Sequence, residues 1–345
     1  AAPALTPGTG ILLVDKDSAT IPAATVNALR IGGVDTVYII GGEGAVPAAL
    51  ATALDNLPNY NCAGAVETVP ILGTPKTLDI VRIGGNDRYE TGRNVAERPG
   101  LGAAGTVDYD GTAADPDGPA CSAKKTAILA TGENFPDALV AGPVSFQGLV
   151  PVGAPGGTVV PPGLAGCGNN GGFPLILTTG TALHPQAASA LTNLGIQQVI
   201  IMGGTAAVTT ATESAVQAIG GITTRRFAGL NRLDTAKQFD DFAIGFLGYS
   251  RTVVSVARGD TFPDALTGGP NAGTPGPTPN VIALTESPTT VGTETTAFFK
   301  SRPGTVGVFG ATAPLSPITD VDVYGGTAAV ADSTVSAILA TISQA

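Results

Sequence analysis

The chain has 345 residues, of which 43% are hydrophobic and 13% charged, so a large core is available, and no apolar run is long enough to cross a bilayer. Its formal net charge of −10 argues against a nucleic-acid partner, because such binding depends on lysine and arginine side chains that neutralise phosphates. The opening Ala-Ala-Pro-Ala is typical of a secreted chain whose signal peptide has been removed.

The first predicted module, residues 1–98, holds three apolar runs that we interpret as strands, at 11–14, 37–40 and 80–83. A helix is expected to follow the third run. The strand and helix that open each later module are missing from this one. Residues 99–123 form a predicted inserted loop before the next module.

The second predicted module, residues 124–247, is the complete copy of the pattern. Four strands are predicted, each followed by a helical segment, at 126–130, 174–179, 198–202 and 225–228. Apolar strands that alternate with helices predict a parallel sheet covered on both faces. A capping box is expected where a helix opens at Thr210, with Glu213 three residues later.

The third predicted module, residues 248–345, repeats the opening of the second. The stretch Phe135-Pro136-Asp137-Ala-Leu returns as Phe262-Pro263-Asp264-Ala-Leu, each time after an apolar strand. A proline in the first turn of a helix costs no hydrogen bond, and each aspartate has the capping-box spacing from Asn134 or Thr261. Two stretches, 305–315 and 321–330, compete to be the third strand of this module.

Two further patterns repeat. A strand followed by two glycines occurs three times, at Gly41-Gly42, Gly203-Gly204 and Gly325-Gly326, and predicts turns that need glycine. A longer pattern reads Arg-Ile-Gly-Gly-Asn-Asp-Arg-Tyr-Glu-Thr from Arg82 and Arg-Phe-Ala-Gly-Leu-Asn-Arg-Leu-Asp-Thr from Arg226. The sequence therefore predicts an α/β fold of three tandem Rossmann-like modules, the first of them incomplete.

In this order the motifs resemble the cell wall binding repeat 2 family, over nearly the whole chain. The family's Ile-Leu-Leu strand matches residues 11–13 and 175–177 and, weakly, 281–283. The resemblance implies a pseudo-threefold arrangement of modules that anchor a bacterial surface protein, without a covalent bond, to anionic cell-wall polymer. It also implies a part in polymer binding for Leu175, Ile176 and Leu177.

Arg88 and Arg232 are the candidate binding residues that the chain itself singles out. Each falls at the first residue of a predicted helix, where a cation opposes the helix dipole at a cost of about 0.3–1 kcal/mol. One explanation is a structural ion pair with Asp137 or Asp264. The other is that each arginine reaches an anionic ligand at the carboxyl edge of the sheet. The same edge would then also hold Arg82, Arg226 and Arg258.

Two smaller features remain open. Each cysteine lies in a loop rich in glycine and proline, and Cys121 and Cys167 precede two strands of one module, which favours a disulfide between them. A group of closely spaced carboxylates resembles either a Ca²⁺ site or a solvated acidic loop: Asp108, Asp110, Asp115 and Asp117.

These features favour a secreted, non-catalytic surface protein that binds anionic cell-wall polysaccharide, with no cofactor. The only histidine, His184, stands before a proline and is interpreted as a surface or capping residue. The alternative function is self-assembly into a surface layer or filament, because the incomplete first module would leave a sheet edge open. The first ten residues or a long loop of the same chain would cover that edge equally well.

Overall fold

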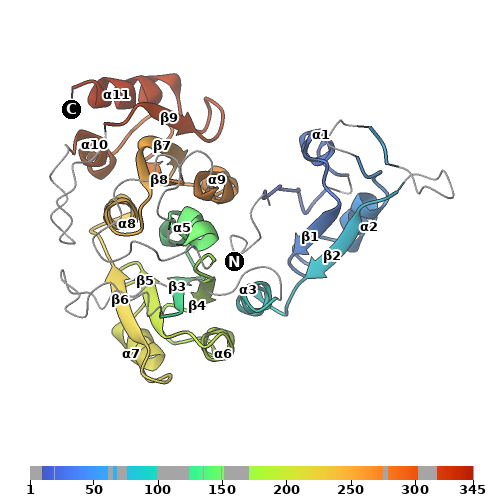
Figure 1. Ribbon diagram of the computed structural model, residues 1–345, viewed down its shortest axis with the longest axis horizontal. Helices are drawn as coiled ribbons and strands as arrows, with labels where there is room; N and C mark the ends of the chain where they lie inside the picture. Colours follow the sequence, from blue (N-terminus) through green and yellow to red (C-terminus); the bar gives the residue numbers. More distant parts are fainter. Residues whose placement is uncertain are drawn as a thin grey trace. The chain divides into compact units, whose positions relative to one another are not determined.

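The computed structural model describes residues 10–18, 20–60, 65–67, 76–98, 124–134, 136–148, 150, 171–274, 279–301 and 317–344. The described chain forms two compact units. The first unit is Leu12–Val95, and the second contains the chain from Ala96 onward. Figure 1 colours both along the sequence.

The first unit has a two-stranded parallel sheet. It contains α1 (Ala23–Gly32), β1 (Thr36–Ile40), α2 (Ala48–Asp55), β2 (Asp79–Ile83) and most of α3 (Arg88–Ala96). β1 pairs with β2 in register from Thr36 opposite Asp79. A small core of four leucine and isoleucine side chains holds the helices to the sheet: Leu29, Ile39, Leu54 and Leu78.

The strand predicted at 11–14 is not formed. The order of the complete sheet gives the reason. There β4, the counterpart of 11–14, pairs only with β3, the opening strand of its module. The first unit has no opening strand among its described residues, so 11–14 has no neighbour with which to exchange hydrogen bonds.

The second unit begins with a four-stranded parallel sheet in the order β4-β3-β5-β6. Its strands are β3 (Thr126–Thr131), β4 (Leu175–Thr178), β5 (Gln198–Met202) and β6 (Thr223–Phe227). The helices that accompany it are α4 (Pro136–Leu139), α5 (Gly142–Gln147), α6 (Pro185–Asn193), α7 (Thr210–Gln217) and α8 (Arg232–Gly245).

A three-stranded parallel sheet in the order β8-β7-β9 completes the second unit. It contains β7 (Ser250–Arg258), α9 (Pro263–Gly273), β8 (Asn280–Thr285), α10 (Thr293–Lys300), β9 (Asp320–Val323) and α11 (Asp332–Ile342). The candidate stretch 321–330 contains the third strand of this module, because β9 lies at its start and pairs with β7. The rival stretch at 305–315 lies outside the described residues. Each sheet falls within one predicted module; the exact module boundaries and the pseudo-threefold arrangement stay predictions.

The strand register corrects one alignment of the repeats. Leu177 pairs with Ala130, and Leu284 pairs with Ala257, the counterpart of Ala130. The copy of Leu175–Leu177 in the last sheet is therefore 282–284 and not 281–283.

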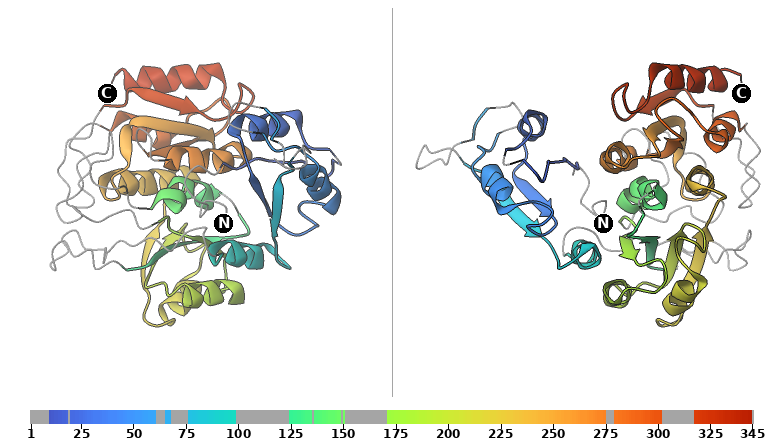
Figure 2. Two further views of the ribbon diagram at one scale, coloured as in Figure 1. Left: turned by 45° about the vertical axis from the view of Figure 1, so that its right-hand side comes forward. Right: turned by 180° about the vertical axis from the view of Figure 1, so that it is seen from behind.

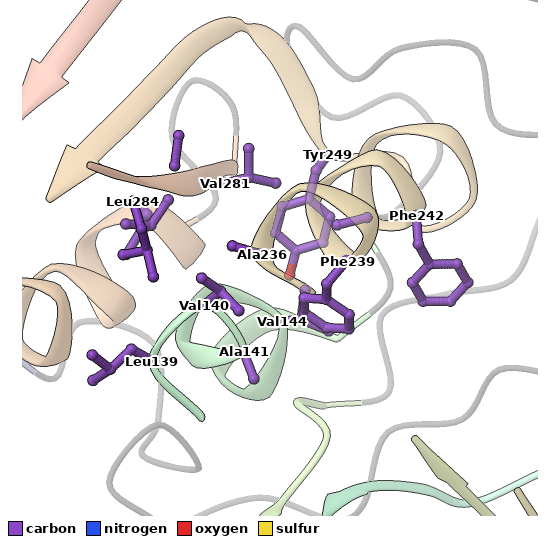
Figure 3. Packing of buried hydrophobic residues seen from close by; sticks show 14 of the residues in the cluster. Leu139, Val140, Ala141, Val144, Ala236, Phe239, Phe242, Tyr249, Val281 and Leu284 are labelled. Carbon is purple, nitrogen blue, oxygen red and sulfur yellow. The ribbon is translucent and has the colours of Figure 1, made fainter. Parts of the chain in front are cut away.

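One hydrophobic core joins the two sheets of the second unit. Phe239 of α8 and the following Tyr249 lie beside Val144 of α5 in Figure 3, whereas Phe242 points away from α5 and packs on Phe227 of β6; all three of these side chains are buried. The Tyr249 hydroxyl donates to the Pro143 carbonyl at 3.1 Å. α5 and α9 lie side by side, as Figure 2 shows, and they touch at Gly142 and Gly269. A Cβ on Gly142 would lie 3.0 Å from the Gly269 Cα, so a side chain there would press α9 away by a few tenths of an ångström.

Candidate functional site

A Gly-Gly turn follows β1, β5 and β9, one in each sheet, as predicted. The first glycine has a positive φ in every copy, 120° at Gly41, 96° at Gly203 and 101° at Gly325, which explains the need for glycine. The Arg82 Nη1 donates to the Gly41 carbonyl at 2.8 Å, and the Arg226 Nη1 donates to the Gly203 carbonyl at the same distance. These two arginines therefore brace the turns.

The aspartates of the Phe-Pro-Asp motifs also face these turns. A Cβ on Gly203 would lie 2.5 Å from the Asp137 Oδ2, and a Cβ on Gly325 would lie 2.7 Å from the Asp264 Oδ2. Pro263 opens α9 as predicted, but the capping box expected there is wrong, since the N-cap is Phe262 and no side chain caps the helix. Each aspartate instead fits against a residue that has no side chain.

Arg226 is paired with a glutamate of α7, the helix that precedes its strand. Its Nη2 lies 2.8 Å from the Glu213 Oε2, and the other oxygen of Glu213 accepts from the Thr224 hydroxyl at 2.9 Å. The predicted role of Glu213 in a capping box is therefore wrong. The helix is capped one residue earlier than expected, by Thr209, whose hydroxyl accepts from the Thr212 N–H.

Arg82 differs from Arg226 because no glutamate stands beside it. Ala51 takes the place of Glu213 in the first unit, and among the described residues Arg82 forms no ion pair. The positive charge of Arg82 is therefore not balanced by a carboxylate of the described residues, whereas Glu213 balances that of Arg226.

The caps of α3 and α8 form as predicted. The Asn231 Oδ1 accepts from the Leu233 and Asp234 N–H groups, and the Asp234 carboxylate accepts from the Leu230 N–H at 2.9 Å. In α3, the Asp87 Oδ1 accepts from the Glu90 N–H at 2.7 Å, while the Glu90 carboxylate accepts from the Asn86 N–H. Arg88 and Arg232 are the first helical residues, where the sequence placed them.

Arg232 reaches from the four-stranded sheet to the three-stranded one. Its Nη1 donates to the Gly259 carbonyl, just after β7, at 2.8 Å, and this acceptor offsets its unfavourable place at the helix start. It forms no ion pair with a carboxylate of the described residues, and its side chain is exposed. The predicted pairing with Asp137 or Asp264 is therefore not found in the part of the chain that the structure describes.

Arg232 nevertheless acts on nearby carboxyl groups through space. Burial raises the pKa of Asp137, and the charge of Arg232 opposes that rise. The pKa of Asp260 is lowered, chiefly by its hydrogen bond from Arg258 and to a smaller extent by Arg232. Arg258 itself is held by Asp260 through two hydrogen bonds of 2.7 Å, so its charge is matched.

Two apolar side chains stand beside these charges. Leu230 is 96% exposed in the loop between β6 and α8, and Phe262 is 42% exposed in the loop between β7 and α9. Because Arg232 joins the two loops, we name residues 229–232 and 258–262 the junction edge. Sequence reasoning missed Leu230, although a leucine between glycine and asparagine at a helix start has no core to enter and was a usable signal.

Other predicted site residues lie elsewhere. Leu175 and Ile176 are buried in β4, and only Leu177 retains some exposed surface. His184 caps α6, because its side chain accepts from the Gln186 N–H at 3.3 Å, as predicted. Pro136 opens α4. The remaining predicted residues lie outside the described part of the chain: Phe135, Cys121, Cys167, Asp108, Asp110, Asp115 and Asp117.

Comparison with known proteins decides the family. The model of the cell wall binding domain 2 (CWB2) family matches residues 82–152 and 226–335, a little over half of the chain. The chain belongs to this family. The matched segments contain Arg82, Arg226, Arg232 and the junction edge. Family membership confirms the resemblance drawn from the motifs, and it agrees with the predicted place at the bacterial cell wall or surface.

The relatives are longer proteins. The N-acetylmuramoyl-L-alanine amidase LytC of Bacillus subtilis (strain 168) is 26% identical over 169 residues, which make up 48% of this chain and 25% of the amidase. Cwp8 and Cwp6 from Clostridium difficile share the fold, with TM-scores of 0.62 and 0.64 and identities of 20% and 17%. Both similarities cover 97% of this chain but only 43% and 40% of those structures. None of the helices in the described ranges is long and apolar enough to span a membrane.

Proposed function

We propose that this cell wall binding chain is a non-catalytic surface protein that holds anionic cell-wall polysaccharide at the junction edge. The observation that carries the proposal is Arg232, an exposed guanidinium that makes one hydrogen bond, to Gly259, and no ion pair with the described residues. Its remaining N–H donors are available to a phosphate or carboxylate oxygen.

The neighbours of Arg232 suit a sugar polymer. Leu230 and Phe262 expose apolar surface on the same edge, and the apolar face of a sugar ring packs on such side chains. The charge there is low, because Asp260 matches Arg258. Each contact is therefore weak, and firm attachment would come from several repeats that engage one polymer together.

Wall binding tests the proposal directly. The full chain is sedimented with bacterial walls that carry anionic polymer, and Arg232→Gln is compared with Arg226→Gln. We expect Arg232→Gln to weaken binding severalfold while its melting temperature changes little. Arg226→Gln should lower the melting temperature and leave the binding of the folded protein unchanged, because Arg226 is already paired.

Two controls sharpen the result. Binding should fall as salt rises, since exposed charges are screened, and it should fall on walls from which the anionic polymer has been removed. If Arg232→Gln binds walls as the parent does, the junction edge is not the site. Equal binding to walls with and without anionic polymer would contradict the proposed ligand.

Self-assembly into a layer or filament stays a prediction. Among the described strands β9 lies at the edge of the last sheet, and its Asp320 and Asp322 argue against assembly there, because charged edge residues oppose strand pairing. Light scattering on the full chain, and on a form without its first ten residues, measures the assembly state. A monomer at high concentration in both forms would end that hypothesis.

A further inference from the structure

A groove runs along α10 in the second unit. Its volume is about 540 Å³, which is within the usual range for sites that bind small molecules. The helix contributes four side chains at helical spacing, which therefore share one face of α10: Thr293, Thr296, Ala297 and Lys300. The loop between β8 and α10 contributes Glu286, Thr290 and Val291. We name this feature the α10 groove.

The α10 groove adjoins the junction edge. A Cβ on Gly292, at the start of α10, would meet both the Leu233 side chain and the Cβ of Glu286. Leu233 directly follows Arg232, and its Cδ2 would lie 3.5 Å from a Cβ on Gly259, whose carbonyl accepts from Arg232. One leucine side chain therefore separates the junction edge from the groove, and a polymer held by Arg232 can continue past it to Glu286.

The groove contains two charges that the described chain does not match. Glu286 and Lys300 are both exposed, and neither side chain forms an ion pair or a hydrogen bond with a described residue. Both charges suit the dipole of α10, since the acid stands near the start of the helix and the lysine at its end. Their hydrogen-bonding capacity is unused within the described chain, so both remain available to a ligand.

The surface between the two charges suits a sugar or polyol chain. The Thr296 hydroxyl donates to the Gly292 carbonyl at 2.7 Å and can still accept one hydrogen bond, and the Thr293 hydroxyl makes none with the described residues. Ala297 adds apolar surface on the same face. Seven helical residues separate Thr293 from Lys300, a rise of about 10 Å, so the groove has its acid and its base at opposite ends.

Glu286 determines which class of polymer fits. Units that carry only anions would be repelled by this carboxylate as they continue from Arg232. We infer that the α10 groove holds a unit of the polymer that carries an ammonium group as well as an anion, with the ammonium on Glu286 and the anion on Lys300. This inference rests on the proposed function, because the junction edge supplies the neighbouring contact at Arg232.

A glycerol phosphate polymer that carries D-alanyl esters serves as the probe, since each ester places a primary ammonium near a phosphate. It is compared with the same polymer after N-acetylation, by titration calorimetry with the full chain. We expect the aminated form to bind severalfold more tightly. N-acetylation makes the polymer more negative, so Arg232 and Lys300 alone would favour the acetylated form. A second pair, with glucosamine in place of the alanyl ester, distinguishes an amino sugar from an amino acid as the source of the ammonium.

Variants of the protein locate the ammonium site. Glu286→Gln should abolish the preference for the aminated form without changing the melting temperature, because its side chain is exposed and forms no hydrogen bond with the described residues. Glu294→Gln is the matched control: it removes the same charge from the first turn of α10, at a residue that is not among the described ones lining the groove. It should keep the preference. Lys300→Gln should weaken the binding of both forms severalfold and keep the preference.

Three results would overturn the inference. They are equal or tighter binding of the acetylated form in both pairs, a preference that survives in Glu286→Gln, and a preference that Glu294→Gln also abolishes. The third would mean that only the net charge of the protein matters. Failure of the proposed function is distinguishable, because Arg232→Gln would then bind both forms as the parent does, whatever the ratio between them in Glu286→Gln.

Discussion

Asp240 is an acidic side chain in surroundings that disfavour its charge. It lies on α8 with 1% of its surface exposed, and neither carboxylate oxygen accepts a hydrogen bond from the described residues. Burial raises the pKa of Asp240 well above its ordinary value of 3.8, and the charge of Asp241 raises it further against a smaller opposing effect of Lys237. Lys237 is itself bound to Asp241 at 2.7 Å.

The raised pKa makes stability depend on pH with a definite sign. In the unfolded chain Asp240 loses its proton near its ordinary pKa, whereas in the folded chain it keeps the proton to higher pH. Its contribution to stability is therefore complete below pH 3.8 and is lost as pH rises toward the folded pKa. Between pH 3.8 and the folded pKa, each unit of pH lowers the free energy of unfolding by about 1.4 kcal/mol. The melting temperature should fall by about 3–6 °C over the same unit.

The variant Asp240→Asn tests this reasoning, because it keeps the shape of the side chain and removes the titration. Melting temperatures of the parent and the variant are measured by circular dichroism from pH 4 to 8. We expect the melting temperature of the variant to rise relative to that of the parent as pH rises. At neutral pH the variant should be the more stable of the two. Parallel curves over this range would refute the assigned pKa shift. Asp241→Asn is the control of opposite sign, since it removes the partner of Lys237 and should lower stability by about 0.3–1 kcal/mol.

Three further predictions concern the second unit. Glu213→Gln should lower the free energy of unfolding by about 1–3 kcal/mol in chemical denaturation, because the Arg226 side chain, only 15% exposed, loses its charged partner; an unchanged value would contradict the brace. Gly142→Val should cost about 1–3 kcal/mol by the same measurement, because α5 and α9 would be forced apart, whereas Gly326→Ala, whose new methyl group meets nothing within 4 Å, should change little. Peptide mapping without reductant should find Cys121 linked to Cys167, with a contribution of about 3–4 kcal/mol from loop closure; three free thiols would exclude the link.

Local patterns predicted much of the fold. The strands β3, β5 and β8 and the helices α6 and α8 follow from apolar runs, helical spacing and the Asn231 cap, all of which act within a few residues. The position of Arg232 at a helix start was predicted for the same reason. The third strand of the last sheet had two candidates, and only its pairing with β7 separates them.

The wrong predictions arose from contacts between residues far apart in the sequence. The run 11–14 is apolar enough for a strand but lacks a neighbour. Glu213 has the spacing of a capping residue, but the partly buried guanidinium of Arg226 on β6 competes for it and forms the stronger interaction. That Arg226 is matched by Glu213 while Arg232 binds a carbonyl also depends on the packing of sheets and helices, whereas Arg258 pairs with Asp260 only two residues away. Which of the five arginines take part in binding stays a prediction; the contacts show that Arg226 and Arg258 pair with acids.

The place of α8 limits how this chain can be divided. α8 follows the last strand of the four-stranded sheet, yet it packs on β8, and its first residue holds the carbonyl after β7. A cut after Leu247, at the sequence boundary between repeats, would expose the core around Phe239 and Phe242 on one fragment and leave β8 bare on the other. Repeats of this kind are thus not interchangeable parts joined end to end. Because Phe227 of β6 also packs on Phe239 and Phe242, gene duplication, deletion or laboratory grafting would preserve a folded product only if α8 moved together with both sheets.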